Sequence, residues 1–247
     1  MKNNFACIVI ALALSGVCMN AQPGQGTRMI GIAGPTMLTE SGNYILTTSV
    51  SGIVITGSNI TLDLNGQTIR GTGSGEGVRV MGATNVVVRN GGIEGVMMGV
   101  VTMNSTNVRI ENLRIRGVMG APPEAGIMMV ATVNSAVLNN QILNTALGIF
   151  VRGGGSFGNR IEGNTITHMG STGPLGICYN PSDTDPQGPK GDLITRNLIR
   201  GYRQSVALSE SSEYNVVEGN SFIFRTTATF SPSATNVLKN NTEIKIN

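Results

Sequence analysis

Short stretches of alternating apolar and polar residues follow one another along the chain, and one phrase recurs. It reads NITLDLNGQTI (59–69), NVVVRNGGI (85–93), NVRIENLRI (107–115) and NSAVLNNQI (134–142). It returns at 159–166, 192–199, 215–222 and 236–244. Alternation with a period of two residues predicts a strand that buries one face. Each phrase therefore predicts short strands joined by a turn.

The apolar residues of these phrases recur at a nearly constant spacing. We take as anchors Leu64, Val88, Ile110, Val137, Ile161, Ile194, Val217 and Leu238, which stand 21 to 33 residues apart. A second apolar residue follows each of the first seven anchors by five positions, whereas Glu243 occupies that place in the eighth. Between the anchors lies a second phrase, Gly148-Ile149-Phe150-Val151 being one example. Each repeat thus contains two or three strands.

A repeat of this size cannot bury its own apolar face, so the repeats must stack on one another. The period does not match the six-residue or nine-residue β-helix repeats, and the leucine framework of leucine-rich repeats is missing. The pattern predicts an all-β parallel β-helix, a solenoid of about eight coils and roughly 40 Å in length.

Two columns of the predicted stack consist of turn residues. Three positions after the anchor, five consecutive repeats carry Asn, which tolerates left-handed turns and can hydrogen-bond from coil to coil. These residues are Asn140, Asn164, Asn197, Asn220 and Asn241. We interpret this column as an asparagine ladder. Seven positions after the anchor, mostly Gly and Asn occur, and His168, the only histidine, falls in the same column. This predicts a turn with positive φ at His168.

The outward side of the Gly-Ile-x-Val strand forms a third column, and most of its residues are apolar. Its members are Arg79, Val101, Met128, Phe150, Cys178 and Ala207. One interpretation is that a loop or a partner covers these side chains. The other is a shallow groove that accepts a sugar ring.

Composition narrows the choice of class and location. The chain has 247 residues, of which 40% are hydrophobic and 13% charged, which excludes a disordered tail. Lys2 and the apolar run 6–17 predict a secretory signal peptide over residues 1–21, with lipid attachment at Cys18 as an alternative that fits less well. We assign 22–50 to an N-terminal cap and first strand, and 51–247 to the β-helix. The mature protein is predicted to be secreted to the periplasm, cell surface or exterior.

Removal of the signal peptide would leave 16 basic and 14 acidic residues, so charge provides no argument for a nucleic-acid partner. Only Cys178 would remain, which excludes a disulfide within the mature chain. No segment after the signal peptide is long and apolar enough to predict a transmembrane span.

The segment GNYILTTSV…GIVITGSNITLDLNGQTIRG (42–71), with the N-V-x-I-x-N-x-x-I and G-I-x-V phrases that follow it, resembles the right-handed parallel β-helix proteins of the pectin-lyase-like superfamily. The secreted NosD-like, carbohydrate-associated repeat proteins are the most similar among these. The resemblance covers roughly residues 42–247 and implies a right-handed, single-stranded β-helix. It implies polysaccharide as the partner, but no single activity, because this scaffold carries lyases, hydrolases, epimerases and non-catalytic proteins.

The repeat is interrupted by insertions at 118–125, 169–175 and 180–190, and such insertions often form the binding face of a repeat protein. They predict one functional neighbourhood around the third to sixth coils. Its candidate residues are Glu124, Phe150, Arg152, His168, Tyr179, Asp183, Asp185, Lys190 and Arg203.

β-Elimination on a uronate requires a base and a cation or metal that stabilises the developing negative charge. Lys190, His168 or Tyr179 are the candidate bases, and Arg152 or Arg203 the candidate cations. We assign Arg152, His168 and Lys190 as catalytic candidates. Substrate-binding candidates are Phe150, Tyr179, Arg203 and Glu124. Asp183 and Asp185 are the candidate ligands of Ca²⁺. The same two aspartates are too close in sequence to suit a hydrolase.

Two functions follow from these observations. The first is a secreted carbohydrate-associated protein that acts as a polysaccharide lyase on an acidic glycan. The second is a non-catalytic β-helix that binds glycans, mediates adhesion or supports the envelope, and it is favoured by the absence of the residue signatures of polygalacturonases, pectate lyases and alginate epimerases. The final residues IKIN continue the strand pattern without an evident cap. Either a second copy covers the last coil, forming a homo-oligomer, or that coil is simply short.

Overall fold

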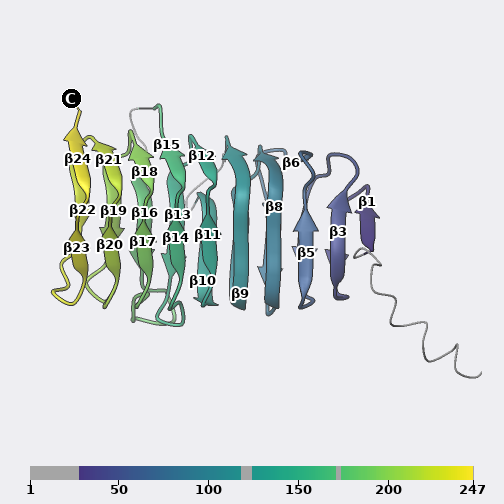
Figure 1. Ribbon diagram of the computed structural model, residues 1–247, viewed down its shortest axis with the longest axis horizontal. Helices are drawn as coiled ribbons and strands as arrows, with labels where there is room; N and C mark the ends of the chain where they lie inside the picture. The colour runs from purple at the N-terminus through teal and green to yellow at the C-terminus, as the bar shows by residue number, and fades with distance from the viewer. Residues whose placement is uncertain (1–27, 118–123, 171–173, 247) are drawn as a thin grey trace, which may run out of the picture.

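The computed structural model describes residues 28–117, 124–170 and 174–246. All regular secondary structure in these residues is β, and the 24 strands pair in parallel. The strands stack side by side along the long axis in a solenoid of about eight coils, with β1 at one end and β22 to β24 at the other (Figure 1). The predicted parallel β-helix is therefore confirmed. The predicted signal peptide (1–21) and its cleavage site lie outside the described residues.

The strands with the anchor residues form the first of three faces. Their register joins Val88, Ile110, Val137, Ile161, Ile194, Val217 and Leu238 in one inward column, as predicted. The coil of the first predicted anchor differs, because Val88 pairs with Leu62 and not with the predicted Leu64. The strands of this face are β1 (Met29–Ile32), β3 (Gly42–Leu46), β5 (Ile60–Asp63), the first half of β8 (Thr84–Glu94), the middle of β9 (Met98–Arg116), β11 (Ala136–Leu138), β14 (Arg160–Glu162), β17 (Leu193–Thr195), β20 (Val216–Glu218) and β23 (Val237–Lys239).

A short turn leads from the first face to the second. The inward column of the second face runs through isoleucines to Phe222. In the last coil Glu243 pairs with Phe222, at the position where the sequence breaks its pattern. All of β24 is exposed. The second face comprises β6 (Thr68–Arg70), the ends of β8 and β9, β12 (Gln141–Leu143), β15 (Thr165–Thr167), β18 (Leu198–Arg200), β21 (Ser221–Phe224) and β24 (Thr242–Lys245).

The third face is built from the Gly-Ile-x-Val phrases. Its glycines lie where one coil passes close to the next: a Cβ on Gly99 would lie 2.4 Å from the carbonyl oxygen of Gly126 and 2.7 Å from the Ile115 side chain. Only glycine fits at such a position. The strands of this face are β2 (Thr36–Leu38), β4 (Ile53–Ile55), β7 (Glu76–Met81), the start of β9, β10 (Ala125–Val133), β13 (Leu147–Arg152), β16 (Leu175–Asn180), β19 (Gln204–Leu208) and β22 (Thr227–Phe230).

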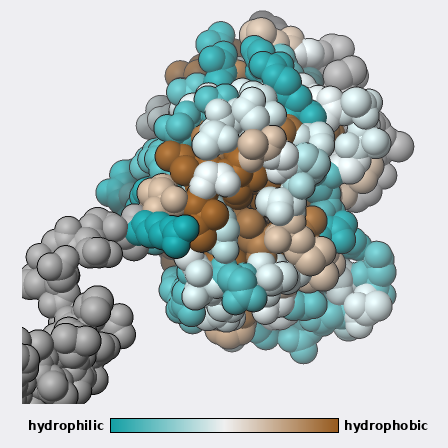
Figure 2. Space-filling view, turned by 90° about the vertical axis from the view of Figure 1, so that its right-hand side faces the viewer, coloured by the Kyte–Doolittle hydropathy of each residue, from teal (hydrophilic) through white to brown (hydrophobic). Residues whose placement is uncertain are grey.

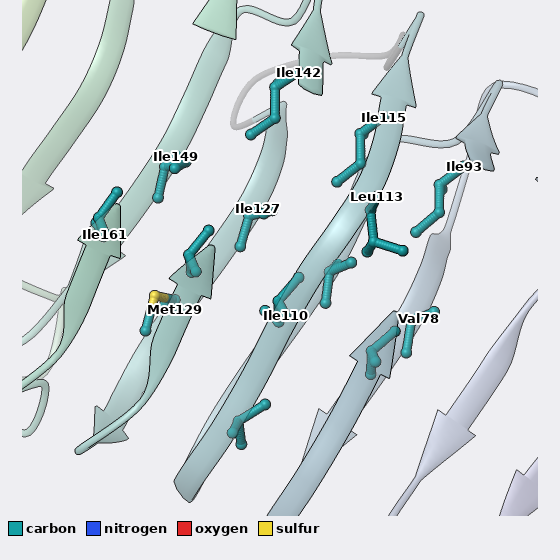
Figure 3. Close-up of a cluster of buried hydrophobic side chains, with 14 of the residues drawn as sticks. Val78, Ile93, Ile110, Leu113, Ile115, Ile127, Met129, Ile142, Ile149 and Ile161 are labelled. Carbon is teal, nitrogen blue, oxygen red and sulfur yellow. The ribbon is translucent and has the colours of Figure 1, made fainter. Parts of the chain in front are cut away.

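The inward side chains of the three faces meet in one continuous core. Ile110, Ile115, Ile127 and Ile142 come from different faces and point toward the same interior (Figure 3), and each is at most 1% exposed. Full burial of one such side chain stabilises the fold by roughly 1.5–3 kcal/mol. The core of each coil is completed by its neighbours.

The solenoid begins earlier than the sequence suggests. Strands β1, β2 and β3 pair in register with β3, β4 and β5. The first coil thus starts at Met29, within the 22–50 segment that we assigned to a cap and first strand. Apolar side chains gather at the centre of this end of the stack (Figure 2), where Met29 and Ile30 are exposed. At the opposite end Leu238 and Ile244 are exposed, and a homo-oligomer through that coil stays a prediction.

Hydrogen bonds confirm the asparagine ladder. The Nδ2 atom of Asn164 donates to Oδ1 of Asn197 at 3.0 Å, and Asn197 repeats this contact with Asn220 at 3.0 Å. The ladder asparagines also bind backbone groups, such as the Ile161 carbonyl. The left-handed turn predicted at these asparagines is wrong, because positive φ occurs one residue earlier, as at Asn139. Buried amides bind coil to coil while the preceding residue makes the turn.

A second buried ladder was missed at the other end of the first face. It runs through Ser135, Asn159, Asp192, Asn215 and Asn236. Asn159, Asp192, Asn215 and Asn236 open their repeated phrases, and Ser135 is the second residue of its phrase, so the signal was present in the sequence.

Asp192 is the one carboxylate in this second ladder. Its Oδ1 accepts the Asn159 backbone N–H at 2.6 Å, and its Oδ2 accepts the Tyr179 hydroxyl at 2.9 Å. Burial raises the pKa of Asp192 to about 6, although the bonds from Asn159 and Tyr179 act in the opposite direction. Burial, the charge of Asp192 and their hydrogen bond raise the pKa of Tyr179 well above its usual value. Tyr179 is fully buried and belongs to the core.

Replacing one ladder asparagine tests its contribution to stability. Asn197→Ala removes the partners of the buried Asn164 amides and of the Ile161 carbonyl. We expect a loss of about 3 kcal/mol in the free energy of unfolding, since each unsatisfied buried group costs roughly 1–3 kcal/mol. Urea denaturation measures it. Asn241→Ala, in the exposed last coil, is the matched control and should cost about 1 kcal/mol or less, because water can replace the lost bonds. Equal losses would contradict the ladder's role.

Asp192 predicts a pH-dependent stability. Because the pKa of its carboxyl is raised on folding, the folded state binds the proton more tightly than the unfolded state. This stabilisation is complete below about pH 4 and is lost as pH rises through about 6. Melting temperatures measured from pH 4 to 8 should fall over that interval in the wild type.

The variant Asp192→Asn should flatten this pH dependence, and Asn fits the column because Asn159 and Asn215 occupy it in the adjacent coils. Asp183→Asn, at an exposed aspartate, is the control and should leave the slope unchanged. A slope that persists in Asp192→Asn would refute the assignment.

Candidate functional site

The outward sides of the three faces differ in chemistry. On the first face, charged side chains of neighbouring coils pair with one another. Arg89 Nε lies 2.9 Å from Asp63 Oδ2, and Lys239 Nζ lies 3.0 Å from Glu218 Oε2. Arg160 and Arg196 both pair with Glu162. These contacts make the first face a surface of compensated charge.

The third face carries an apolar surface on its outward side. The predicted column Arg79, Val101, Met128, Phe150, Cys178 and Ala207 is confirmed by the register of β7, β9, β10, β13, β16 and β19. From Val101 to Cys178 the side chains are only 2–8% exposed and form an apolar cluster separate from the core. The interpretation that this column is covered therefore holds at its centre, and an open groove there is wrong.

An open hollow of about 700 Å³ lies beside this cluster, over the outward side of β2, β4 and β7. Its apolar lining includes Met37, Val54 and Met97, and its polar lining includes Glu76 and Arg79. The Arg79 guanidinium binds the Glu76 carboxylate with both Nε and Nη2, the latter at 2.7 Å. Their hydrogen bond and opposite charges raise the pKa of Arg79. We name this hollow the third-face pocket.

Sequence reasoning missed the third-face pocket. Arg79 stood in the outward column, but Met37 and Val54 lay in or next to the segment assigned to the cap. The register extends the same column through Val54 to Met37. Recognition that β1 to β4 already belong to the stack would have revealed it.

Several predicted site residues meet at the end of the third-face strands. Arg152 Nη2 lies 2.5 Å from Asp183 Oδ1, and the guanidinium carbon lies 5.8 Å from the centre of the Phe150 ring. Asp185 accepts backbone N–H bonds from Gly154 and Gln187, both at 2.9 Å. Lys190 Nζ donates to Gln187 Oε1 at 3.1 Å. This cluster holds the 180–190 loop against β13.

Glu124 and Arg203 lie at the opposite end of the same face. The Glu124 carbonyl oxygen accepts the N–H of Leu147, the first residue of β13, and Arg203 precedes β19. Arg152 is the last residue of β13, about 16 Å away at ~3.3 Å per residue. The predicted neighbourhood is thus divided between the two ends of the strands.

His168 also lies near the strand starts, after β15. Its ring is tilted by 48° against Tyr202 at a centroid distance of 5.4 Å. Burial lowers the pKa of His168, a weak contact with the Thr145 backbone acts in the opposite direction, and the charge of Arg225 lowers the pKa further. In the described residues neither ring nitrogen has a partner in hydrogen-bond geometry. The predicted positive φ is wrong, since His168 is not among the residues with that backbone conformation.

The predicted ligands of a metal are dispersed or already engaged. Asp183 and Asp185 bind Arg152 and backbone amides, and no group of three or more His, Cys, Asp or Glu residues in the described ranges could hold a metal ion. Burial raises the pKa of Cys178 to about 12, so that its thiol stays protonated. Ca²⁺ binding by the two aspartates stays a prediction, one that these contacts do not favour.

Solved structures share the fold at low sequence identity. An alginate lyase from Paenibacillus sp. str. FPU-7 has 13% identity and a TM-score of 0.55, over 87% of this chain and 95% of that one. Open reading frame 18 of Geobacillus virus E2 has 15% identity and a TM-score of 0.48, over 98% and 63%. The lacto-N-biosidase from Eubacterium ramulus has 10% identity and a TM-score of 0.47, over 91% and 46%. The similarity to the lyase supports the β-helix fold and carries no conclusion about activity.

The sequence itself identifies the family. The described part of the chain contains no helix with the length and apolar character that a membrane span requires. No curated protein matches the sequence. The family described as periplasmic copper-binding protein (NosD) matches residues 11–175, which are 165 of the 247 residues. The chain therefore belongs to the NosD family of β-helix proteins.

Proposed function

We propose that this protein is an exported, polysaccharide-binding β-helix protein, and that the third-face pocket binds part of an acidic glycan. The observation that carries the proposal is the pocket itself, an open hollow of about 700 Å³ with apolar walls and a charged pair. Ligand sites usually combine a mainly apolar lining with a few well-placed polar groups. Met37 and Val54 suit the C–H side of a sugar ring. Glu76 binds Nε and Nη2 of Arg79, and the remaining Arg79 N–H groups suit a glycan carboxylate.

Export and the ligand class draw on the comparisons. The family description names the periplasm, which agrees with the signal peptide expected over residues 1–21. The lyase with the same fold acts, by its name, on alginate, which is an acidic polysaccharide. We extend only the class of ligand to this chain, because a fold does not determine an activity.

We do not extend copper binding, which the family description also names, to this chain. Copper sites in proteins use His nitrogen and soft sulfur ligands. The single histidine has its ring against Tyr202, and the Cys178 thiol is buried and protonated. The thioethers of Met37, Met81 and Met97 line the third-face pocket, but neither His nor Cys lies beside them in its lining. In the part of the chain that the structure covers, no His, Cys, Asp and Glu residues converge as a metal site.

The arrangement favours binding over β-elimination. A lyase needs its base and its charge-stabilising cation around one substrate atom. Arg152 and Lys190 lie at the strand ends and are engaged with Asp183 and Gln187, whereas His168 lies toward the strand starts. Tyr179 is buried in the core. Arg152 and Lys190 remain our candidates for a second contact with an acidic group.

The third-face pocket predicts the effect of one substitution on binding. Arg79→Gln removes the charge that a glycan carboxylate would bind, and a hydrogen bond to a charged group is worth roughly 1.5–3 kcal/mol. We therefore expect about tenfold weaker binding of alginate or pectate oligosaccharides in calorimetric titrations. Arg109→Gln is the matched control, because Arg109 is also exposed and paired with a nearby glutamate. Unchanged binding in Arg79→Gln would remove the pocket from the proposal.

We also predict binding without cleavage. Incubation with pectate, alginate and glycosaminoglycans should produce no new ultraviolet absorbance from unsaturated uronates. The candidate cation Arg152 and the candidate base Lys190 are bound to Asp183 and Gln187, and His168 lies toward the other end of the strands. The positive control is a lyase of known activity under the same conditions. Absorbance that appears with the wild type and is lost in Lys190→Ala or Arg152→Ala would instead establish a lyase.

A further inference from the structure

Two hollows open on the outward side of the second face, and Arg114 lines both of them. One of about 620 Å³ includes Arg70, Arg114 and Arg116 in its lining. The other, of about 460 Å³, is lined by Arg114 together with polar side chains such as Asn112 and Gln141. We name this surface, from Asn112 across Arg114 to Arg70 and Arg116, the arginine groove. It lies on a different face from the third-face pocket.

The larger hollow exists because side chains are missing from its floor. Gly71, Gly95 and Gly117 follow Arg70, Glu94 and Arg116 in successive coils and line the hollow. A Cβ on Gly71 would lie 2.5 Å from the Gly95 carbonyl oxygen, and Gly95 has φ +66°. A larger residue is therefore excluded at Gly71 and strained at Gly95. The backbone forms a floor between arginine side chains.

The charge of the arginine groove is only partly compensated. Glu94 lies between Arg70 and Arg116 and pairs with both, at 2.7 Å for Arg116. Arg114 has no acidic neighbour in its column, because Gly92 and Gln141 occupy the adjacent coils. Arg114 belongs to none of the ion pairs in the described residues. The surface thus has three guanidinium groups and one carboxylate, which pairs with only two of them.

This arrangement differs from an ordinary solvated face. On the first face, Arg89, Arg109, Arg160 and Arg196 all pair with acidic residues. Arg114 is exposed between two hollows without such a partner. Since a guanidinium binds carboxylate and sulfate groups through parallel hydrogen bonds, an anionic ligand would complete the surface.

We propose that the arginine groove binds the carboxylate or sulfate groups of an acidic polysaccharide. The proposal takes its ligand class from the proposed function but places the contact on another face. Arg114 and Arg116 bind the anionic group, and the amides of Asn112 and Gln141 bind sugar hydroxyls. The coils repeat at ~4.8 Å, so that a polymer along the stack meets a new row of outward side chains at each step.

The lining favours a glycan over a nucleic acid. Single-stranded nucleic acids bind on aromatic side chains that stack with the bases. Neither hollow has an aromatic residue in its lining. Amide side chains suit hydroxyl groups instead.

Calorimetric titration of the full chain tests the arginine groove. The probes are an oligogalacturonate, a heparin oligosaccharide of similar length and neutral cellohexaose. We expect Arg114→Gln/Arg116→Gln to weaken binding of the anionic probe at least tenfold. Arg200→Gln is the matched control, because Arg200 is exposed in the column of Arg116 but lies outside the two hollows. It should change binding less than twofold. Tighter binding of the oligogalacturonate would indicate carboxylate recognition, and tighter binding of the heparin oligosaccharide would indicate sulfate recognition.

Circular dichroism and melting temperatures establish that each variant is folded. Equal weakening in Arg200→Gln, or unchanged binding in the double variant, would overturn the proposal. Loss of binding only in Arg79→Gln would overturn the arginine groove and leave the proposed function intact. Binding by the wild type to none of the probes would overturn both. An oligothymidylate serves as a further probe. If it binds more tightly than either anionic glycan, the arginine groove is a nucleic-acid site and the proposed glycan ligand is overturned.

Discussion

No coil of this protein can satisfy its own backbone or bury its own inner side chains, and that constraint determines the rest of the structure. Each strand finds its hydrogen-bond partners one coil before and one coil after. Inward isoleucines complete the core only when coils stack. The two amide ladders add buried hydrogen bonds that hold the register, because a coil shifted by one residue would lose its ladder contacts.

The constraint acts on the inward positions and leaves the outward positions free to vary. Three outward surfaces with different chemistry result from one repeating backbone. On the first face, charged side chains form ion pairs. The second face carries arginines around a hollow whose floor includes glycines. The third face has an apolar cluster with a pocket beside it. A rigid stack of this kind can present different ligand groups at a regular spacing, which suits an extended polymer.

The inward pattern was readable from the sequence because stacking repeats it in every coil. The anchors from Val88 to Leu238 and the asparagine column aligned as predicted, and Glu243 fell in the inward column of the last coil. The anchor of the Leu62 coil was misplaced at Leu64, because the turn between Leu62 and Ile69 is two residues longer than its counterpart between Val88 and Ile93. Repeat spacing alone cannot show which residues of a longer turn leave the strand register.

The sequence by itself determined the β-helix, its coils and the outward column, because periodicity and turn chemistry act locally and repeat. Only the tertiary structure decided which side chains share a site. Glu124 and Arg152 belong to neighbouring coils but lie at opposite ends of the third face, and Tyr179 turns inward to Asp192. Arg70, Arg114 and Arg116 meet around one hollow although two coils separate Arg70 from Arg116. Such neighbours depend on strand register and corner geometry, which the order of residues along one repeat does not contain.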